Sequence, residues 1–402
     1  MTFSQERDSD KTYPAPLPRR DLFLLPAIGF VTVCILLVVT ELVARRLFSE
    51  SKTNTESCLV LNDKKTGVRG VPNSVCWEKL PESQLIEYRF DNCGYRSGMQ
   101  CVPKAPGTYR IVMMGSSVAI GERVPINSTL ATLLPQLLIE RTGRTIELYN
   151  EGMAYGFPRT AAMRFHEVLA QKPDMVLWVL TPADIGEGEF VFAENAAESG
   201  GLRAKIWSKL KEAVTTNSIM DRVRNHVEHS RTGLMLQHFI YQNESESQYV
   251  TSYLMGADRV TGFLRSNMSP EWRTHLAEFE ARSQEIATKS ADAGVTLVAV
   301  YLPNRPQAAM IAMGTWPAGY DPYALNRELQ AIIVKQGGIF VDVLPGFRSI
   351  PNPEQYYLPV DGHPTATAHV IFSKLTANEL TSGAVPALKS SIPNQVSAEK
   401  GR

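Results

Sequence analysis

Two serines and a glycine follow a short apolar segment in the stretch YRIVMMGSSVAIG, residues 109–121. The apolar segment is typical of a buried strand, so Ser116 and Ser117 stand where this strand gives way to a helix-like stretch. Three roles fit hydroxyl groups at that place: a helix N-cap, part of a phosphate-binding loop, or a nucleophile. The stretch has neither the lysine of GxxxxGK[ST] nor the spacing of GxGxxG, which argues against the phosphate loop.

A second group of reactive residue types lies near the C-terminus, in LPVDGHPTATAH. His363 precedes a proline, which favours an extended, fixed conformation for the histidine. Asp361 stands two residues before it. A single histidine is more often structural than catalytic. A serine nucleophile, however, needs both a base and a group that orients the base, and this turn offers the two together.

Two further loops carry small and polar residues after predicted strands. The first, YNEGMAYGFP, contains Asn150, Gly152 and Gly156, and the second, LTPADI, contains Thr181 and Asp184. Glycine lets a backbone N–H approach a developing oxyanion, although glycine is also common in ordinary strand-to-helix turns. Asp184 fits a helix N-cap equally well.

These loops need a scaffold that brings strand ends together, and the pattern predicts one. From residue 108 onward, short apolar runs alternate with helical patterns, which is typical of a parallel sheet with helices on both faces. The predicted strands are 109–115, 145–152, 174–182, 295–303 and 338–345, and the predicted helices are 128–143, 161–172, 270–294, about 322–336 and 366–383. We therefore expect a flavodoxin-like, three-layer α/β/α domain with five parallel strands and ligands beyond their carboxyl ends.

The remaining segments fall outside this alternation. Residues 186–269 are polar with a helical pattern, and we interpret them as an insertion within a domain that spans 108–384. The insertion contains WSKL, LMLQHFIYQ and YLMG, which would suit an apolar lid, yet such stripes more often belong to a core. Residues 47–107 are expected to form an irregular, cysteine-bearing linker or subdomain. The polar tails 1–21 and 385–402 are expected to be disordered.

One segment near the start is long and free of charge. Leu22 to Thr40 would span about 28 Å as a helix, close to the thickness of a bilayer core. We predict a transmembrane helix over 22–43. A buried core helix fits less well, because the run is apolar all round and has arginine pairs on both sides. A cleaved signal peptide would be shorter and followed by small residues, but ELVARRLF follows here.

Cysteine usage points to the compartment. Four of the five cysteines follow the apolar span within one short segment, namely Cys58, Cys76, Cys93 and Cys101. An even number suits one or two disulfides in an oxidising compartment. A zinc site is the alternative, but the segment has no Cys-x-x-Cys pair and no histidine. We expect a cytoplasmic N-terminus, favoured by a small margin by the positive-inside rule, and an extracytoplasmic C-terminal domain, periplasmic in a Gram-negative cell.

The overall charge excludes one class of partner. Lys+Arg and Asp+Glu both number 41, so the formal net charge is zero. A nucleic-acid-binding protein would show a basic excess or stripe, so no nucleic-acid partner is expected. No motif indicates a metal or a cofactor, and none is expected.

The order of these pieces resembles the SGNH, or GDSL-like, hydrolase family. YRIVMMGSSVAIGERV, LYNEGMAYG, KPDMVLWVLTPADI and VDGHPTATAHVIFSKL look like the four family blocks. IEYRFDNCGYRSG looks like a segment that often precedes this domain in membrane-anchored bacterial members. The resemblance covers about 108–383, with 186–269 unmatched. It places Ser117 at the nucleophile and His363 at the general base.

Several positions depart from the family pattern. Ser116 replaces the aspartate that precedes the family nucleophile, and Thr181 and Ala183 replace the glycine and the oxyanion-binding asparagine of the third block. Many members have an aspartate three residues before the histidine, where this chain has Val360. Asp361 is therefore the residue expected to orient the base, unless the pair works as a Ser-His dyad.

The resemblance implies a membrane-anchored, extracytoplasmic esterase or acyl-transfer enzyme. Its substrate would be an ester, such as an O-acetyl group, on a glycan or lipid. The backbone N–H groups of Ser117 and of Gly152 or Gly156 would bind the oxyanion. Losing one donor costs roughly 10²–10³ in turnover. A slow esterase, a cap-gated lipase and a non-catalytic envelope protein that binds or helps to acylate a polysaccharide therefore all stay open.

Overall fold

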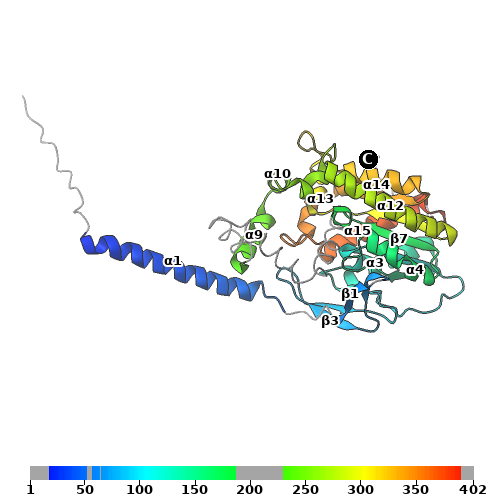
Figure 1. The fold of residues 1–402 in the computed structure, drawn as a ribbon, viewed down its shortest axis with the longest axis horizontal. Helices are drawn as coiled ribbons and strands as arrows, with labels where there is room; N and C mark the ends of the chain where they lie inside the picture. The colour runs from blue at the N-terminus through cyan, green and yellow to red at the C-terminus, as the bar shows by residue number, and fades with distance from the viewer. Residues whose placement is uncertain (1–17, 52–56, 64, 187–229, 391–402) are drawn as a thin grey trace, which may run out of the picture.

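A five-stranded parallel sheet forms the centre of the globular part of the molecule (Figure 1). This computed structural model describes residues 18–51, 57–63, 65–186 and 230–390. The sheet has the order β6-β5-β7-β8-β9, with every neighbouring pair parallel. The strands are β5 (Tyr109–Met114), β6 (Ile146–Asn150), β7 (Met175–Leu180), β8 (Thr296–Tyr301) and β9 (Ile339–Val341). The flavodoxin-like sheet expected from the sequence is confirmed.

The strand order explains both the sequence pattern and the place of the serines. β5 and β7 are buried along their whole length, so their sequences are continuous apolar runs rather than alternating ones. The chain adds β6 on one side of β5 and then β7 on the other. The carboxyl end of β5, which leads directly into Ser116 and Ser117, therefore lies at the switch point where such sheets bind ligands.

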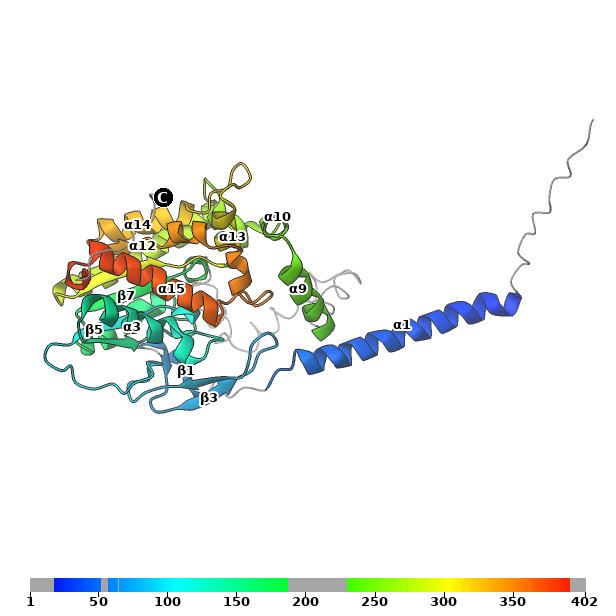
Figure 2. The same cartoon turned by 180° about the vertical axis from the view of Figure 1, so that it is seen from behind.

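Helices cover both faces of the sheet (Figures 1 and 2). α3 (Leu130–Thr142) and α15 (Ala366–Glu379) pack together on one face. On the other face lie α4 (Pro158–Ala170), α12 (Pro270–Asp292) and α14 (Ala324–Lys335). These are the five helices that the sequence predicts, with ends shifted by a few residues. The sequence did not predict α13 (Arg305–Met313), whose N-cap, Asn304, stands three residues after the end of β8.

The cysteine-bearing segment is more regular than expected. It forms two antiparallel hairpins: β1 (Leu59–Asp63) with β2 (Gly67–Gly70), and β3 (Val75–Glu78) with β4 (Ile86–Arg89). Disulfides join Cys58 to Cys76 and Cys93 to Cys101. Of the two alternatives, linker or subdomain, the irregular linker does not fit, because four short strands and two disulfides fix the chain. The paired cysteines agree with the disulfide alternative.

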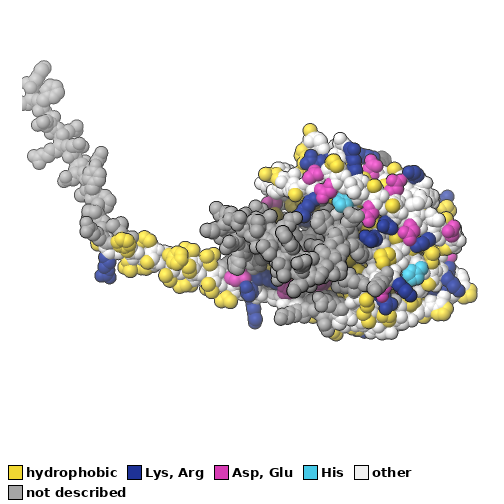
Figure 3. All heavy atoms as spheres, in the orientation of Figure 1, with side chains coloured by type: hydrophobic (Ala, Val, Ile, Leu, Met, Phe, Trp, Pro, Cys, Tyr) yellow, Lys and Arg dark blue, Asp and Glu magenta, His cyan; other side chains and the backbone are white. Residues whose placement is uncertain are grey.

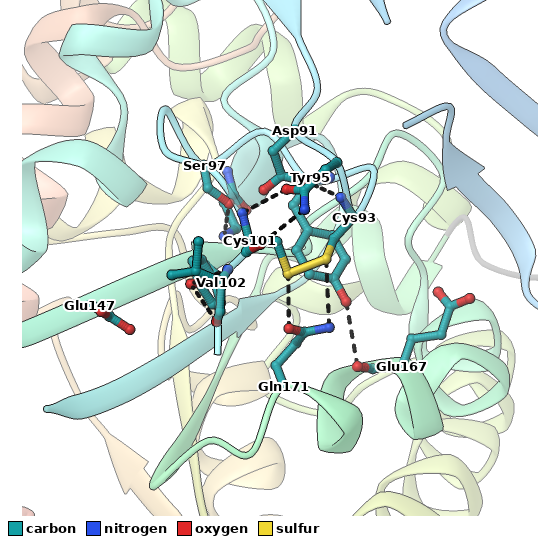
Figure 4. The surroundings of a disulfide bond; sticks show 12 residues. Asp91, Cys93, Tyr95, Ser97, Cys101, Val102, Glu147, Glu167 and Gln171 are labelled. Carbon is teal, nitrogen blue, oxygen red and sulfur yellow. Dashed lines mark hydrogen bonds between the residues drawn. A yellow bond between two sulfur atoms is a disulfide. The ribbon is translucent and has the colours of Figure 1, made fainter. Parts of the chain in front are cut away.

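The second disulfide ties this segment to the main domain (Figure 4). The side chain of Gln171, just after α4, lies against both sulfurs and donates to the Cys93 sulfur at 3.9 Å. The Tyr95 hydroxyl donates to the carbonyl of Glu167, within α4, at 3.4 Å. The cysteine-bearing segment is therefore packed on the sheet domain as part of it.

A long helix, α1 (Arg19–Leu47), extends away from the domain (Figure 1). Its segment Phe23–Leu47 is long and apolar enough to cross a membrane, and none of its most apolar stretch is buried. Figure 3 shows apolar side chains along this helix. The predicted span 22–43 lies within α1.

The described part of the insertion is helical. α5 (Pro182–Gly186) follows β7, and α9 (Arg231–Asn243), α10 (Glu246–Leu254) and α11 (Asp258–Thr261) precede α12. The LMLQHFIYQ stretch lies in α9, whereas WSKL falls outside the described residues.

The C-terminal tail begins later than expected. Val385 and Leu388 are buried, and the 3-10 turn Pro386–Leu388 packs on the domain. The prediction of a disordered tail from residue 385 is wrong for residues 385–390, because two apolar side chains hold them to the core.

Candidate active site

Ser117 begins the short helix α2 (Ser117–Ile120) directly after β5. Gly115 has a φ of +147°, and a Cβ there would lie 2.5 Å from the Val179 carbonyl oxygen, so only glycine lets β5 turn this close to β7. Gly121, with a φ of +78°, ends the helix. As the first residue of α2, Ser117 has an N–H with no acceptor inside the helix. The turn therefore presents a hydroxyl and an N–H together.

Arg96, which sequence reasoning missed, holds this turn from outside. It is fully buried, and its guanidinium lies 4.4 Å from the ring centre of Tyr88. It donates to the carbonyls of Ile120 at 2.9 Å, Gly121 at 2.7 Å and Val124 at 2.9 Å. These three contacts with one charged group fix the chain after Ser117, and a fourth, to the Glu87 carbonyl at 3.1 Å, ties it to β4. Arg96 is thus a positioning residue for α2.

Asp361 and His363 pair on the loop before α15. The Asp361 Oδ1 lies 2.6 Å from the His363 Nδ1 and also accepts the His363 backbone N–H at 3.2 Å. Gly362 between them has a φ of +80°, which makes the tight turn possible. Each side chain is 23% exposed. The aspartate therefore reaches the ring nitrogen despite its shift of one position from the family pattern.

Opposing effects set the charge of this pair. Burial lowers the pKa of His363, but the hydrogen bond and charge of Asp361, together with the charge of Glu122, outweigh it and raise the pKa above its ordinary value. Burial raises the pKa of Asp361, whereas the hydrogen bond from His363 and the positive charges of His363 and Arg123 bring it down to about 2. Asp361 is therefore ionised at neutral pH and stabilises an imidazolium.

Glu122 is a second carboxylate beside the histidine, and sequence reasoning missed it. Its Oε2 lies 3.5 Å from the His363 Nε2. Arg123 contacts Glu122 at 3.2 Å, Glu78 at 2.5 Å and Asp361 at 3.5 Å. Burial raises the pKa of Glu122, and the positive charges of His363 and Arg123 oppose that rise. The histidine thus stands between two carboxylates, one at each ring nitrogen.

Ser117, Asp361 and His363 line one cavity of about 430 Å³. Among the described residues, no hydrogen bond joins the Ser117 hydroxyl to His363, whose Nε2 faces Glu122 instead. Hydrogen bonds in ligand-free active sites are often long and tighten only with substrate. The cavity is otherwise lined mainly by aromatic, proline and small residues, among them Thr181, Ala183, Tyr241, Tyr249, Ser252, Tyr253, Pro303, Tyr357 and Phe372.

The N–H groups of the two glycines predicted to bind the oxyanion donate to other acceptors. The Gly152 N–H donates to the Asn150 side chain at 3.0 Å, and the Gly156 N–H donates to the Met153 carbonyl at 2.7 Å. Neither glycine lines the cavity. A Cβ on Gly156 would collide with the Gly115 carbonyl, so close packing requires the glycine there. The oxyanion role predicted for Gly152 or Gly156 is therefore corrected, because both N–H groups already have acceptors.

Most of the four predicted accessory residues also lie outside the cavity. Asn150 is fully buried and donates to the Ala119 carbonyl at 3.0 Å, so it braces α2. Asp184 accepts the N–H and hydroxyl of Thr181 at 2.7 and 2.6 Å, which makes it a cap of the turn. Ser116 is buried, and its hydroxyl has no partner among the described residues. Of these four residues, only Thr181 lines the cavity.

Glu82 fixes the loop that carries the histidine. It lies between β3 and β4, and it accepts the backbone N–H of Val360 at 3.0 Å and that of Asp361 at 2.7 Å. Its other oxygen lies 2.6 Å from the Nδ1 of His238 in α9. The side chain is 3% exposed, so these contacts are formed out of water. Glu82 links the cysteine-bearing segment, α9 and the histidine loop.

Arg305, at the start of α13, braces the same loop from the other side. It donates to the carbonyls of Glu354 at 3.2 Å, Pro359 at 2.5 Å and Tyr241 at 2.7 Å, and lies 4.1 Å from the ring centre of Tyr249. Because Tyr241 belongs to α9 and Tyr249 to α10, this buried arginine also holds both helices against the cavity.

Comparison with known proteins adds little to this geometry. No protein-family model matches the chain, and no curated protein matches it. Among solved structures, the acetylxylan esterase Axe2 from Geobacillus stearothermophilus is 13% identical, with a TM-score of 0.37, over 70% of this chain and 96% of the esterase. LAE5, an alpha/beta hydrolase enzyme from the metagenome of Lake Arreo, Spain, is 14% identical, with a TM-score of 0.38, over 70% and 97%. TesA is 13% identical, with a TM-score of 0.36, over 68% and 98%. Scores this low carry no argument about function.

Proposed function

We propose that this protein is a serine esterase or acyl-transfer enzyme of SGNH type, anchored in a membrane by α1. One observation carries the proposal: Ser117, at the switch point of the sheet, lines the same cavity as the His363–Asp361 pair, whose side chains are 2.6 Å apart. A strand-terminal serine, a base and a carboxylate that orients the base are the parts that nucleophilic acyl transfer requires.

The reaction would proceed in two acyl-transfer steps. As the Ser117 oxygen attacks the acyl carbonyl, the His363 Nε2 takes its proton and then gives it to the leaving alkoxide. Asp361 keeps the proton on Nδ1 and stabilises the imidazolium. Water or a sugar hydroxyl then attacks the acyl-enzyme, again with His363 as the base. Before the first step, the imidazole must turn so that its Nε2 faces Ser117 instead of Glu122.

The oxyanion would accept hydrogen bonds from fewer donors than in the family pattern. The Ser117 N–H is free of the helix ladder, whereas Ala183 offers no side-chain donor. Each lost donor costs roughly 10²–10³ in turnover, so we expect a slow enzyme.

The substrate and the compartment complete the proposal. A cavity of about 430 Å³ is within the range that holds a small organic group, and its aromatic lining suits an acylated sugar or a lipid ester. The two disulfides support an oxidising, extracytoplasmic location for the domain.

Hydrolysis of aryl acetates by the purified full-length protein tests the mechanism. Ser117→Ala and His363→Ala should each lower kcat/KM at least about 10³-fold. Ser252→Ala, a serine that lines the same cavity without a role in the reaction, should stay near wild type. Unchanged activity in Ser117→Ala, with the fold retained, would refute the proposal.

A second candidate function rests on Ala183 and on the occupied N–H groups of the two glycines. The domain would then bind an acylated polysaccharide without cleaving it. No hydrolysis by the wild type, together with saturable binding of an acetylated oligosaccharide that Ser117→Ala leaves unchanged, would favour this candidate.

A further inference from the structure

We propose that α9 lies on the membrane surface, with one apolar face at the boundary between headgroups and acyl chains, and thereby holds the cavity next to the bilayer. The proposed partner is a lipid surface. This inference rests on the membrane anchor proposed above and extends it to a second element of the chain.

The outward face of α9 is apolar. Leu236, Phe239 and Ile240 follow the spacing i, i+3, i+4, which places them on one side of the helix. Their exposed fractions are 53%, 49% and 52%, so about half of each side chain stays uncovered by the described residues. Three large apolar side chains side by side are an unusual surface for a helix that meets only water.

The opposite face of α9 is fixed to the candidate active site. His238 and Tyr241 lie on that side of the helix. His238 contacts Glu82 at 2.6 Å, and the Tyr241 carbonyl accepts from Arg305 at 2.7 Å. Tyr241 also lines the cavity. The helix therefore has one face committed to the domain and one apolar face directed outward, as amphipathic helices on membrane surfaces do.

The beginning of α9 is bonded to the end of α1. Glu41 accepts the backbone N–H of Thr232 at 2.9 Å and its hydroxyl at 2.8 Å. Arg231 forms an ion pair with Glu50. Figures 1 and 2 show that α9 lies beside this end of α1 and runs across its axis rather than along it.

The depth of this junction follows from the length of the anchor. A bilayer core of about 30 Å takes roughly 20 helical residues, which places the boundary near Leu42 when the span begins at Phe23. Glu41 then lies at the boundary, and Arg45 and Arg46 lie just beyond it among the headgroups. Because the first turn of α9 is bonded to Glu41 and the helix crosses the direction of α1, α9 would run along the membrane surface.

The lipid surface is a better occupant of the stripe than a second protein. One edge of the stripe lies beside the end of the anchor: the ring of Phe48, a buried residue directly after α1, lies 6.4 Å from that of Phe239 in an edge-to-face contact. A partner protein would have to bind at the place where the anchor already brings lipid.

A spin-label experiment on the full chain in lipid nanodiscs tests the inference. Cys34 is the free, exposed cysteine of the described residues, so a Cys34→Ser background lets a nitroxide be attached at one chosen position. The test positions are Leu236→Cys and Ile240→Cys. Leu36→Cys, 59% exposed in α1, reports the membrane, and Val334→Cys, 55% exposed in α14, reports water. Collision with oxygen, which concentrates in lipid, is compared with collision with a water-soluble nickel chelate.

The inference predicts an oxygen-to-nickel ratio at residues 236 and 240 several-fold above that at 334 and closer to that at 36. A ratio at both test positions equal to that at 334, with 36 in lipid, would overturn the inference and leave the anchor in place. Protection of both test positions from both reagents would mean that a second copy covers the stripe, which also overturns it. A water-like ratio at 36 would refute the anchor itself and the inference with it.

Discussion

At the scale of single residues, the unusual feature is a histidine between two carboxylates. Asp361 holds Nδ1, as in a serine triad, but Glu122 lies 3.5 Å from the Nε2 that must serve Ser117. In the proposed mechanism, Glu122 therefore competes with Ser117 for His363 in the substrate-free state. Both carboxylates favour the protonated imidazole, which cannot act as a general base.

Replacing Glu122 tests this competition. The pKa of His363 is raised, so activity should be lost as pH falls through a value above the ordinary one of about 6.5. Glu122→Gln removes one of the two negative charges that raise the pKa of His363. The acid limb of the kcat/KM profile should therefore move to lower pH, and kcat/KM on that limb should rise several-fold. Glu78 belongs to the same cluster but contacts Arg123 rather than the histidine. Glu78→Gln should therefore shift the acid limb of the kcat/KM profile less. Identical acid limbs in Glu122→Gln and the wild type would contradict the competition.

Residue types and their order singled out the two serines after β5 and the Asp361–His363 turn before α15, and the family resemblance chose Ser117 between the serines. The structure places Ser117, Asp361 and His363 around one cavity. Glu122, Arg96 and Glu82 carry no such signal. Glu122 sits in a turn where an acidic residue is unremarkable. Arg96 and Glu82 reach the site through contacts between segments far apart in the sequence, such as Arg96 with Ile120 and Glu82 with Asp361. Side-chain chemistry alone does not show which distant segment a residue will meet.

At the scale of elements, the loop that carries the histidine is held from two sides by Glu82 and Arg305. Glu82 satisfies two backbone N–H groups on that loop without being exposed to solvent. A small displacement of the loop would change the distance between His363 and Ser117, and displacements near 1 Å can lower rates about 10²-fold.

The variant Glu82→Ala should therefore lower kcat by roughly tenfold to 10²-fold while the substrate KM changes less. Steady-state kinetics with an aryl acetate measure both constants. Gln84→Ala changes an exposed residue of the same connection and should behave like the wild type. A wild-type kcat in Glu82→Ala would show that the loop keeps its place without this contact.

The elements that sequence reasoning found are those with a strong pattern, namely the five strands, which are short apolar runs, and the five covering helices, which are long. It missed α13, whose nine residues follow β8 after a connection of only three residues, and the hairpins β1–β4, whose strands have four or five residues each. Short elements stabilised by disulfides and tertiary contacts leave a weak pattern in the sequence.

At the scale of the whole molecule, the account depends on a domain that folds outside the cytoplasm. Two disulfides are typical of an oxidising compartment and support the proposed location. Alkylation of the unreduced, denatured protein isolated from membranes should modify one cysteine, Cys34, and alkylation after reduction should modify all five. Five reactive cysteines without reduction would place the domain in a reducing compartment.

The most direct test of the central claim is to trap the acyl-enzyme. The full-length protein would be mixed with an aryl acetate, quenched in acid within the first turnover, and digested for peptide mass analysis. The account predicts an acetyl group on Ser117 that decays with time in the wild type, accumulates in Glu82→Ala no faster than in the wild type, and is absent from Ser117→Ala. Turnover of the ester with no acetyl group on Ser117, or with an acetyl group at another residue, would contradict the account.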